Sequence, residues 1–153
     1  MSHLALALLG PFQATLDGRP AQHLHSDRLR ALLAYLAVSS GQDHARQHLA
    51  SLLWPERSDR EALSALRYAL SNLRTALGDR GAPSPYLLVT RTTVQFRPAS
   101  DHWLDTAEFD SLKDRSDVAS LERAVSLYRG PFLDGLSVGD SPAFDEWILL
   151  QGE

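Results

Sequence analysis

Cysteine is absent from the chain of 153 residues, which excludes disulfide bonds and metal sites built on thiolates. The first residues contain no basic segment of the kind that begins a secretory signal peptide, and Gly10-Pro11 soon interrupts their apolar run. No apolar stretch approaches the length of a membrane-spanning helix. We therefore expect neither a cleaved signal nor a membrane anchor.

Residue groupings typical of enzymes are also missing. No Ser-His-Asp spacing, glycine-rich phosphate loop or catalytic pair of acidic residues stands out. His44 and His48 are one helical turn apart, but no third ligand suggests itself, so we predict neither a metal site nor a cofactor. Asp105, Glu108 and Asp110 form an acidic patch, which we interpret as a solvated surface. The sequence does not favour an enzymatic function.

Charge is distributed unevenly along the chain, whose net charge is −4. Residues 1–98 contain 11 arginines and 7 acidic residues, whereas residues 99–153 contain 4 basic and 12 acidic residues. This pattern fits a basic module that faces DNA, followed by a region that does not touch it. Compositional drift between two solvated segments is the alternative. Since 44% of the residues are hydrophobic, the chain suffices for one core with a small appendage.

The segment from Ser58 to Gly78 predicts an amphipathic helix. Ser58 with Glu61 forms a capping box, and Gly78 is suited to end the helix. Its leucines share one face, and no carboxylate follows Glu61 on the other. The polar face contains Arg60, Ser64, Arg67, Tyr68, Ser71, Asn72, Arg74 and Thr75. Such donors suit phosphates and base edges, although an ordinary solvated helix face is the alternative.

The order of the remaining patterns predicts an α+β fold, a winged helix-turn-helix preceded by an antiparallel sheet. The expected elements are strands over 4–8, 12–16 and 19–24, a helix capped by Ser26, a second helix capped by Asp43, the long helix, and a hairpin over 86–97. In this fold the third helix enters the major groove, and the hairpin tip reaches the neighbouring backbone or minor groove.

After residue 98 the pattern becomes helical. Helices are expected over 106–112, over 118–128 with Ser116 or Asp117 as the cap, and from Pro142 to Glu153. The last helix contains Phe144 and Trp147, which would need a partner to cover them, so we expect the chain to continue in a longer protein. We therefore divide the chain into a winged-helix domain, residues 1–98, and a helical region, residues 99–153.

Several segments resemble a known family. Leu32–Val38, Arg46–Trp54 and Leu66–Gly78 resemble the DNA-binding domain of the Streptomyces antibiotic regulatory protein (SARP) family. Leu127–Leu136 and Phe144–Trp147 resemble the start of the bacterial transcriptional activator domain that follows it. The resemblance implies a winged helix of the response-regulator type, joined to a tetratricopeptide-like helical domain.

The resemblance also implies a function. Members of the family are transcription activators that bind direct repeats in double-stranded DNA near promoters, usually as paired protomers. They recruit RNA polymerase, partly through its σ factor. A cytoplasmic protein associated with the nucleoid is therefore expected. The alternative is a protein-interaction module whose winged helix does not read DNA, suggested by the acidic, aromatic-bearing region around Trp147.

Roles follow for the residues of the long helix and the hairpin. Arg67 and Ser71, near the middle of the helix, are the candidates for base edges, and Arg60 and Arg74 are candidates for phosphate. Ser64, Tyr68 and Thr75 lie on the same groove-facing side. Arg91 at the hairpin tip is a candidate for the minor groove or phosphate, or else a solvated turn residue.

Two further sets of candidates lie around the second helix. His44 and Arg46 are expected at its start, where backbone amides can hold a phosphate, although Arg46 can equally cover nearby apolar surface. The resemblance implies that the turn after this helix contacts polymerase, with Glu56 and Arg57 as candidates. Trp54 is expected in the core.

Overall fold

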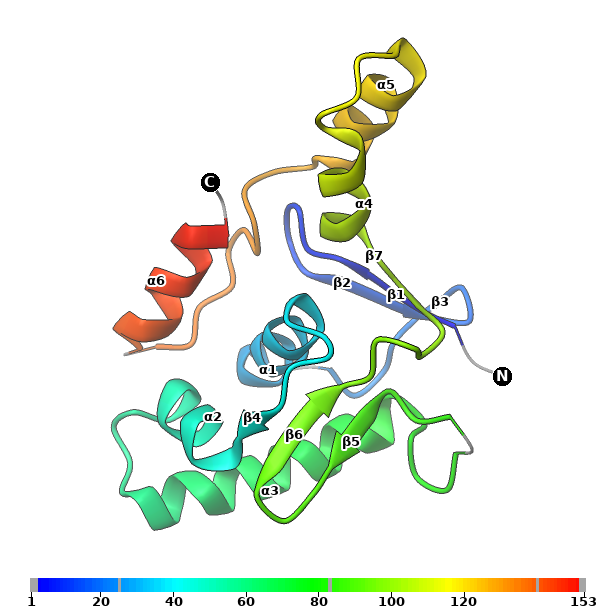
Figure 1. Ribbon diagram of the computed structural model, residues 1–153. Helices are drawn as coiled ribbons and strands as arrows, with labels where there is room; N and C mark the ends of the chain where they lie inside the picture. Colours follow the sequence, from blue (N-terminus) through cyan, green and yellow to red (C-terminus); the bar gives the residue numbers. More distant parts are fainter. Residues whose placement is uncertain (1–2, 25, 83, 140, 152–153) are drawn as a thin grey trace.

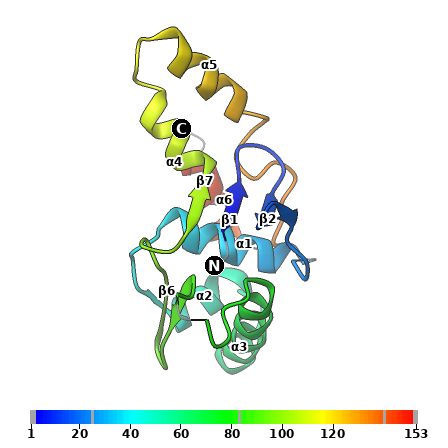
Figure 2. The same cartoon turned by 90° about the vertical axis from the view of Figure 1, so that its right-hand side faces the viewer.

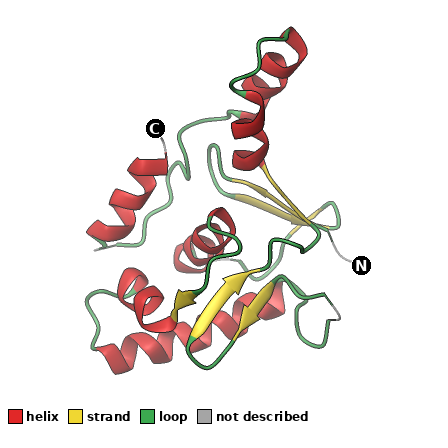
Figure 3. Cartoon of the chain, in the orientation of Figure 1, coloured by secondary structure: helices red, strands yellow, loops and turns green. Residues whose placement is uncertain are grey.

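Two small sheets lie on either side of helix α1 (Asp27–Val38), as Figure 1 shows. The computed structural model describes residues 3–24, 26–82, 84–139 and 141–151. Within these residues, helices and strands are mixed along the chain, as expected for an α+β fold (Figure 3). None of the helices in the described ranges is both long and apolar enough to cross a membrane.

The N-terminal sheet begins with an antiparallel hairpin. Its strands are β1 (Leu4–Ala7), β2 (Gln13–Leu16) and β3 (Arg19–Pro20). Alternate leucines of β1 are fully buried, as their spacing predicted, and a two-residue turn with positive φ at Asp17 and Gly18 joins β2 to β3. The third strand is shorter than predicted and ends at Pro20, although the amide of Ala21 still donates to the carbonyl of Ala14 at 2.9 Å.

A fourth strand, which the sequence analysis missed, completes this sheet. Strand β7 (His102–Leu104) pairs in parallel with β1, so the sheet extends beyond residue 98. Asp105 follows directly, and its buried carboxylate accepts hydrogen bonds from the amides of Leu8 (2.8 Å) and Leu9 (2.9 Å). The interpretation of Asp105 as part of a solvated patch is therefore wrong, because this side chain ties the start of helix α4 (Asp105–Leu112) to the end of β1.

The central helices confirm the predicted order, with one correction at the start of the second. They are α1, capped by Ser26, α2 (Arg46–Leu53) and α3 (Asp59–Ala76). The predicted cap Asp43 does not cap α2, because strand β4 (His44–Ala45) lies between them. The Asp43 carboxylate instead accepts a hydrogen bond from the side-chain amide of Gln95.

The second sheet is the predicted wing. Its hairpin consists of β5 (Leu87–Val89) and β6 (Thr93–Phe96), and β4 adds a third strand on the β6 side. The amide of Arg46 donates to the carbonyl of Thr92 (2.9 Å), which fixes the start of α2 against the hairpin.

A buried carboxylate joins α3 to the wing. Asp79 accepts hydrogen bonds from the amides of Tyr86 (2.8 Å) and Leu87 (3.0 Å). Burial raises the pKa of Asp79, while the two amides and the positive charges of Arg74 and Arg97 oppose that rise. The end of α3 and the base of the hairpin are therefore held together.

Three helices follow the sheets: α4 (Asp105–Leu112), α5 (Val118–Leu127) and α6 (Pro142–Gln151). Asp117, one of two predicted caps, accepts a hydrogen bond from the amide of Ser120 and caps α5. Figures 1 and 2 show that α5 lies at the end of the molecule opposite α3. The predicted helix end at Glu153 lies outside the described residues.

Helix α6 packs onto the central helices, which corrects the expectation that its aromatic residues lack a partner. Phe144 is fully buried. The ring of Trp147 lies 4.9 Å from that of Tyr35 in α1 and 5.4 Å from that of Phe132, between ring centroids. The suggested protein-interaction surface around Trp147 is therefore largely occupied by the chain itself.

Candidate nucleic-acid interface

Helix α3 is fixed at both ends, so its polar face is held in one orientation. The hydroxyl of Ser58 accepts a hydrogen bond from the amide of Glu61 and donates one to its carboxylate. At the other end Gly78 has a positive φ, and the amide of Asp79 donates to the carbonyl of Arg74, which completes a Schellman motif. Leu66 and Leu73 are fully buried on the inner face.

The outer face of α3 presents arginines that form no ion pair with the described residues. Arg60 and Arg67 are exposed, and Arg74 is half-buried. Among the described residues, none of the three forms an ion pair. Arg74 nevertheless lies close enough to Asp79 to lower the pKa of that carboxyl group. Arg60 and Arg67 are therefore the cations of this face that are most available to an external anion.

A groove runs along one side of this face. Glu61, Ser64, Tyr68 and Asn72 line it from α3, and Arg28 and Arg57 line it from outside this helix. The groove encloses about 650 Å³. Tyr68 is 72% exposed, which is unusual for an aromatic ring and makes it available for contact.

The turn before α3 contains the two residues proposed to contact polymerase. Glu56 and Arg57 are both exposed there, as predicted. Glu56 forms an ion pair with Arg28 (3.3 Å), and Arg28 also donates to the carbonyl of Leu53. Arg57 lines the same groove as Ser64 and Tyr68, so it lies beside residues that were predicted to face DNA.

Arg80 is a residue of this face that the sequence analysis missed. Its guanidinium donates to the hydroxyl of Ser71 and, at 3.3 Å, to the hydroxyl of Thr75. The turn at Gly78 reverses the chain and brings this side chain back along the helix. An arginine two residues beyond a helix-ending glycine was the one signal in the sequence that pointed to it.

The tip of the β5–β6 hairpin, which contains Arg91, lies at the same end of the molecule as α3 (Figures 1 and 2). The hydroxyl of Thr90 accepts hydrogen bonds from the amides of Thr92 (3.2 Å) and Thr93 (2.9 Å), which fixes the turn. Arg91 is exposed, and its side chain forms no hydrogen bond or ion pair within the described ranges. Arg91 is therefore available to an external anion at the end of the molecule where α3 lies.

The start of α2 differs from the prediction. His44 is only 6% exposed and belongs to β4, so the prediction that it lies at the exposed start of α2 is wrong. Its Nε2 lies 2.8 Å from the hydroxyl of Ser39, and burial, followed by the charge of His48, lowers its pKa. Arg46 is half-buried, and its Nε has no hydrogen-bond partner in the described part of the chain, which favours the alternative that it covers apolar surface.

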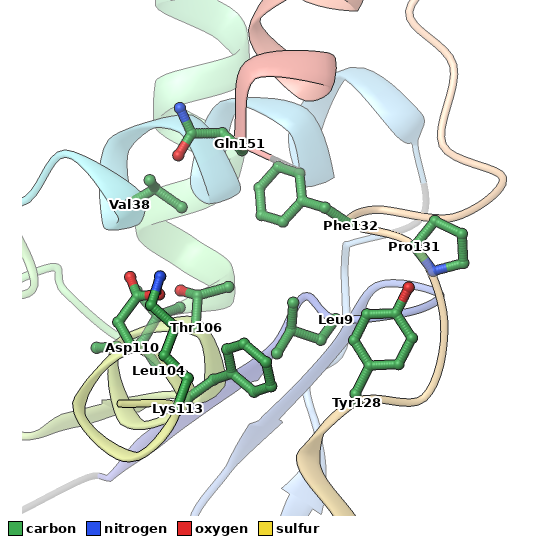
Figure 4. Close-up of a pocket in the computed structure, with 12 residues that line it drawn as sticks. Leu9, Val38, Leu104, Thr106, Asp110, Lys113, Tyr128, Pro131, Phe132 and Gln151 are labelled. Atoms are coloured by element: carbon green, nitrogen blue, oxygen red, sulfur yellow. The ribbon is translucent and has the colours of Figure 1, made fainter. Parts of the chain in front are cut away.

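A second cavity, of about 320 Å³, lies away from this interface (Figure 4). Leu9, Tyr128 and Phe132 contribute apolar walls, and the Asp110–Lys113 ion pair (3.3 Å) lies at its side. None of the predicted DNA-facing residues lines it. The described residues also contain no cluster of three or more histidine or acidic side chains that is placed to hold a metal ion.

The chain was compared with known protein families and with characterised proteins. No family model matches the chain. It is 30% identical, over 144 residues, to the transcriptional regulatory protein EmbR of Mycobacterium tuberculosis and to that of Mycobacterium bovis. The chain is similar to a transcriptional regulator. These alignments cover 87% of the chain but only 37% of EmbR, so the chain spans little more than a third of the length of these relatives.

A solved structure supports the same likeness. The structure of Mycobacterium tuberculosis EmbR in complex with low affinity phosphopeptide matches 98% of this chain and 42% of its own, with a TM-score of 0.75 and 26% identity. The match to EmbR confirms the predicted α+β winged-helix fold. It also supports a role for this chain in transcription regulation.

Proposed function

We propose that the chain binds double-stranded DNA in a sequence-specific manner and acts as a transcription activator of the SARP type. The observation that carries this proposal is the outer face of α3. Its arginines form no ion pair with any described residue, and the tip of the β5–β6 hairpin, which contains Arg91, lies at the same end of the molecule. A face that offers donors suits the acceptors of phosphates and base edges.

The proposed contacts follow from position and exposure. Arg67 and Ser71, near the middle of α3, meet base edges, and an arginine can form two hydrogen bonds with guanine O6 and N7. Arg60, Arg74 and Arg91 meet phosphates, with Arg74 the most restricted because it is half-buried beside Asp79. Ser64, Tyr68 and Thr75 complete the groove-facing surface.

The arrangement of domains and partners extends the proposal. Residues 1–98 form the DNA-binding part, whose N-terminal sheet is completed by β7, and the helices after β7 begin a helical activator region. Paired protomers bind direct repeats, and the turn with Glu56 and Arg57 contacts RNA polymerase, including its σ factor. The similarity to the transcriptional regulatory protein EmbR supports this arrangement.

Salt dependence of DNA binding is the first test. Because each neutralised phosphate releases counterions, the affinity for a promoter duplex should fall steeply with salt, with a logarithmic slope of about 0.9 per phosphate contacted. Gel-shift titrations over a range of salt concentrations measure this slope. Binding that is insensitive to salt contradicts the proposal.

Site selection from random duplexes is the second test. Paired protomers should recover a tandem repeat whose half-sites are separated by about one helical turn of DNA. A single unrepeated site would contradict the proposed pairing but not DNA binding itself.

The alternative function is binding of a protein partner without recognition of DNA. The surface that favours it is not the region around Trp147 but the exposed apolar face of α5. Helix α5 exposes Val118 (69%), Val125 (73%) and, just beyond its end, Tyr128 (53%). Such an apolar stripe suits a protein partner. A chain that shifts no duplex at low salt, yet loses a partner on Val125→Asp, would establish this alternative.

A further inference from the structure

Ser71, Thr75 and Arg80 form a small polar cluster over the last turns of α3. Nη2 of Arg80 donates to the Ser71 hydroxyl, and Nε donates to the Thr75 hydroxyl at 3.3 Å. Nη2 also lies 3.5 Å from the carbonyl oxygen of Ser71. One planar guanidinium therefore contacts two hydroxyls of the face proposed to meet DNA.

The protons of the two hydroxyls are used differently. Thr75 donates its proton to the carbonyl of Ser71, at 3.1 Å, so it has none left for an external acceptor. The hydroxyl of Ser71 accepts from Arg80 and donates no hydrogen bond within the described part of the chain. Ser71 is half-buried, and its proton is the one that remains free.

The guanidinium also restricts what Ser71 can bind. A hydroxyl has one proton and two lone pairs, and a serine alone can donate to one base or accept from another. With one lone pair bound to a cation, a second donor is disfavoured by the adjacent positive charge. An acceptor remains favourable because the proton points away from Arg80.

We propose that Arg80 is a positioning residue for base recognition, which fixes Ser71 as a hydrogen-bond donor towards the DNA. This inference rests on the function proposed above. In the major groove, guanine O6 and N7, adenine N7 and thymine O4 accept hydrogen bonds, whereas the amino groups of cytosine and adenine donate them. Arg80 thus directs Ser71 to an acceptor edge and against an amino group.

Binding measurements on five chains test this role: the unaltered chain, Arg80→Ala, Arg80→Lys, Ser71→Ala and the double variant Ser71→Ala/Arg80→Ala. The quantity measured is the affinity ratio between the selected duplex and a duplex in which the base facing Ser71 presents an amino group. Arg80→Ala should lower this ratio about three- to tenfold, the effect of one hydrogen bond. Arg80→Lys should not restore it, because an ammonium lacks the planar fork that holds both hydroxyls.

The double variant separates positioning from direct contact. If Arg80 acts through Ser71, Arg80→Ala should cause no further loss of discrimination in the Ser71→Ala chain. The opposite result would be that Arg80→Ala lowers the affinity for all duplexes equally and lowers the salt slope by about one, both in the unaltered chain and in the Ser71→Ala chain. That result would make Arg80 a phosphate contact and overturn the inference.

The affinity ratio also shows whether a negative result overturns only the role of Arg80 or the proposed function as well. Partial unfolding of a variant lowers its affinity for both duplexes but leaves their ratio unchanged, so the ratio reports on recognition rather than on stability. An unaltered chain that bound no duplex would overturn the proposed function and this inference together. An unaltered chain that discriminates, with an Arg80→Ala variant that discriminates equally well, would overturn this inference alone.

Discussion

The hydroxyl of Ser141 donates a hydrogen bond to the carbonyl of Leu52 at 2.6 Å and accepts one from the amide of Phe144 at 3.2 Å. The first bond reaches the end of α2, and the second caps α6. A single buried side chain thus joins the helix-turn-helix to the last described helix. The position of α6 is consequently coupled to that of the helices that support α3.

Replacement of Ser141 should measure this coupling. Ser141→Ala removes the cap and leaves the Leu52 carbonyl unpaired in a buried site, so we expect a loss of about 1–2 kcal/mol in the free energy of unfolding. Urea unfolding provides the measurement. The control is Ser111→Ala, because that hydroxyl bonds only a carbonyl on the exposed side of α4. Equal effects of the two substitutions would contradict the proposed coupling.

Arg67 should determine sequence preference rather than general affinity. Arg67→Ala removes a candidate contact to a base edge, and we expect discrimination at one base position to fall by about 1–3 kcal/mol. Competition between duplexes that differ at single positions measures this change. A uniform loss across all duplexes would instead assign Arg67 to phosphate.

Arg91 should act in the opposite way. Arg91→Ala is expected to weaken binding to all duplexes about equally and to reduce the salt slope by about one, as for the loss of one phosphate contact. Arg115→Ala is the matched control, since it removes the same charge from the exposed loop between α4 and α5, at the far end of the molecule. If both substitutions weakened binding equally, Arg91 would contribute only through net charge.

The stability of the fold should decrease as the pH falls below neutrality because of His44. Burial holds the pKa of His44 below its ordinary value near 6.5, so the unfolded chain takes up a proton there that the folded chain does not. Nearby His48 adds to the lowering, and Asp43 opposes it. The contribution of His44 is therefore fully present above pH 6.5 and is lost as the pH falls towards the folded-state pKa.

Unfolding free energies measured between pH 7.5 and 5 by urea titration test this prediction. One proton accounts for a slope of at most about 1.4 kcal/mol per pH unit. His44→Gln should flatten the profile, whereas His23→Asn, a change at an exposed histidine, should leave it unaltered. A His44→Gln profile parallel to that of the unaltered chain would show that the acid sensitivity arises elsewhere.

The elements that the sequence predicted correctly are those with strong local signals. Ser26 and Ser58 are followed by regular apolar spacing, and Asp17-Gly18 matches a two-residue hairpin turn, so these caps and this turn lie where predicted. The leucines of α3 recur at helical spacing, so the sequence predicted correctly which face of this helix is buried and which is exposed.

The elements that the sequence analysis missed depend on distant partners. Strand β4 contains two residues and β7 three, too few to show a period, and each is a strand only because β6 or β1 provides its hydrogen bonds. The burial of Trp147 likewise depends on Tyr35, far away in the chain. For the same reason Arg80 escaped notice, since its contacts appear only after the turn at Gly78 is placed in space.

The pairing of β7 with β1 has a consequence for the synthesis of the protein. Leu8 and Asp105, which bond each other where these strands end, are separated by 97 residues along the chain. During translation β1 therefore emerges from the ribosome with one edge open, and it keeps that edge open until β7 has also been made. Helix α3 is therefore complete on the nascent chain before the N-terminal sheet gains its last strand.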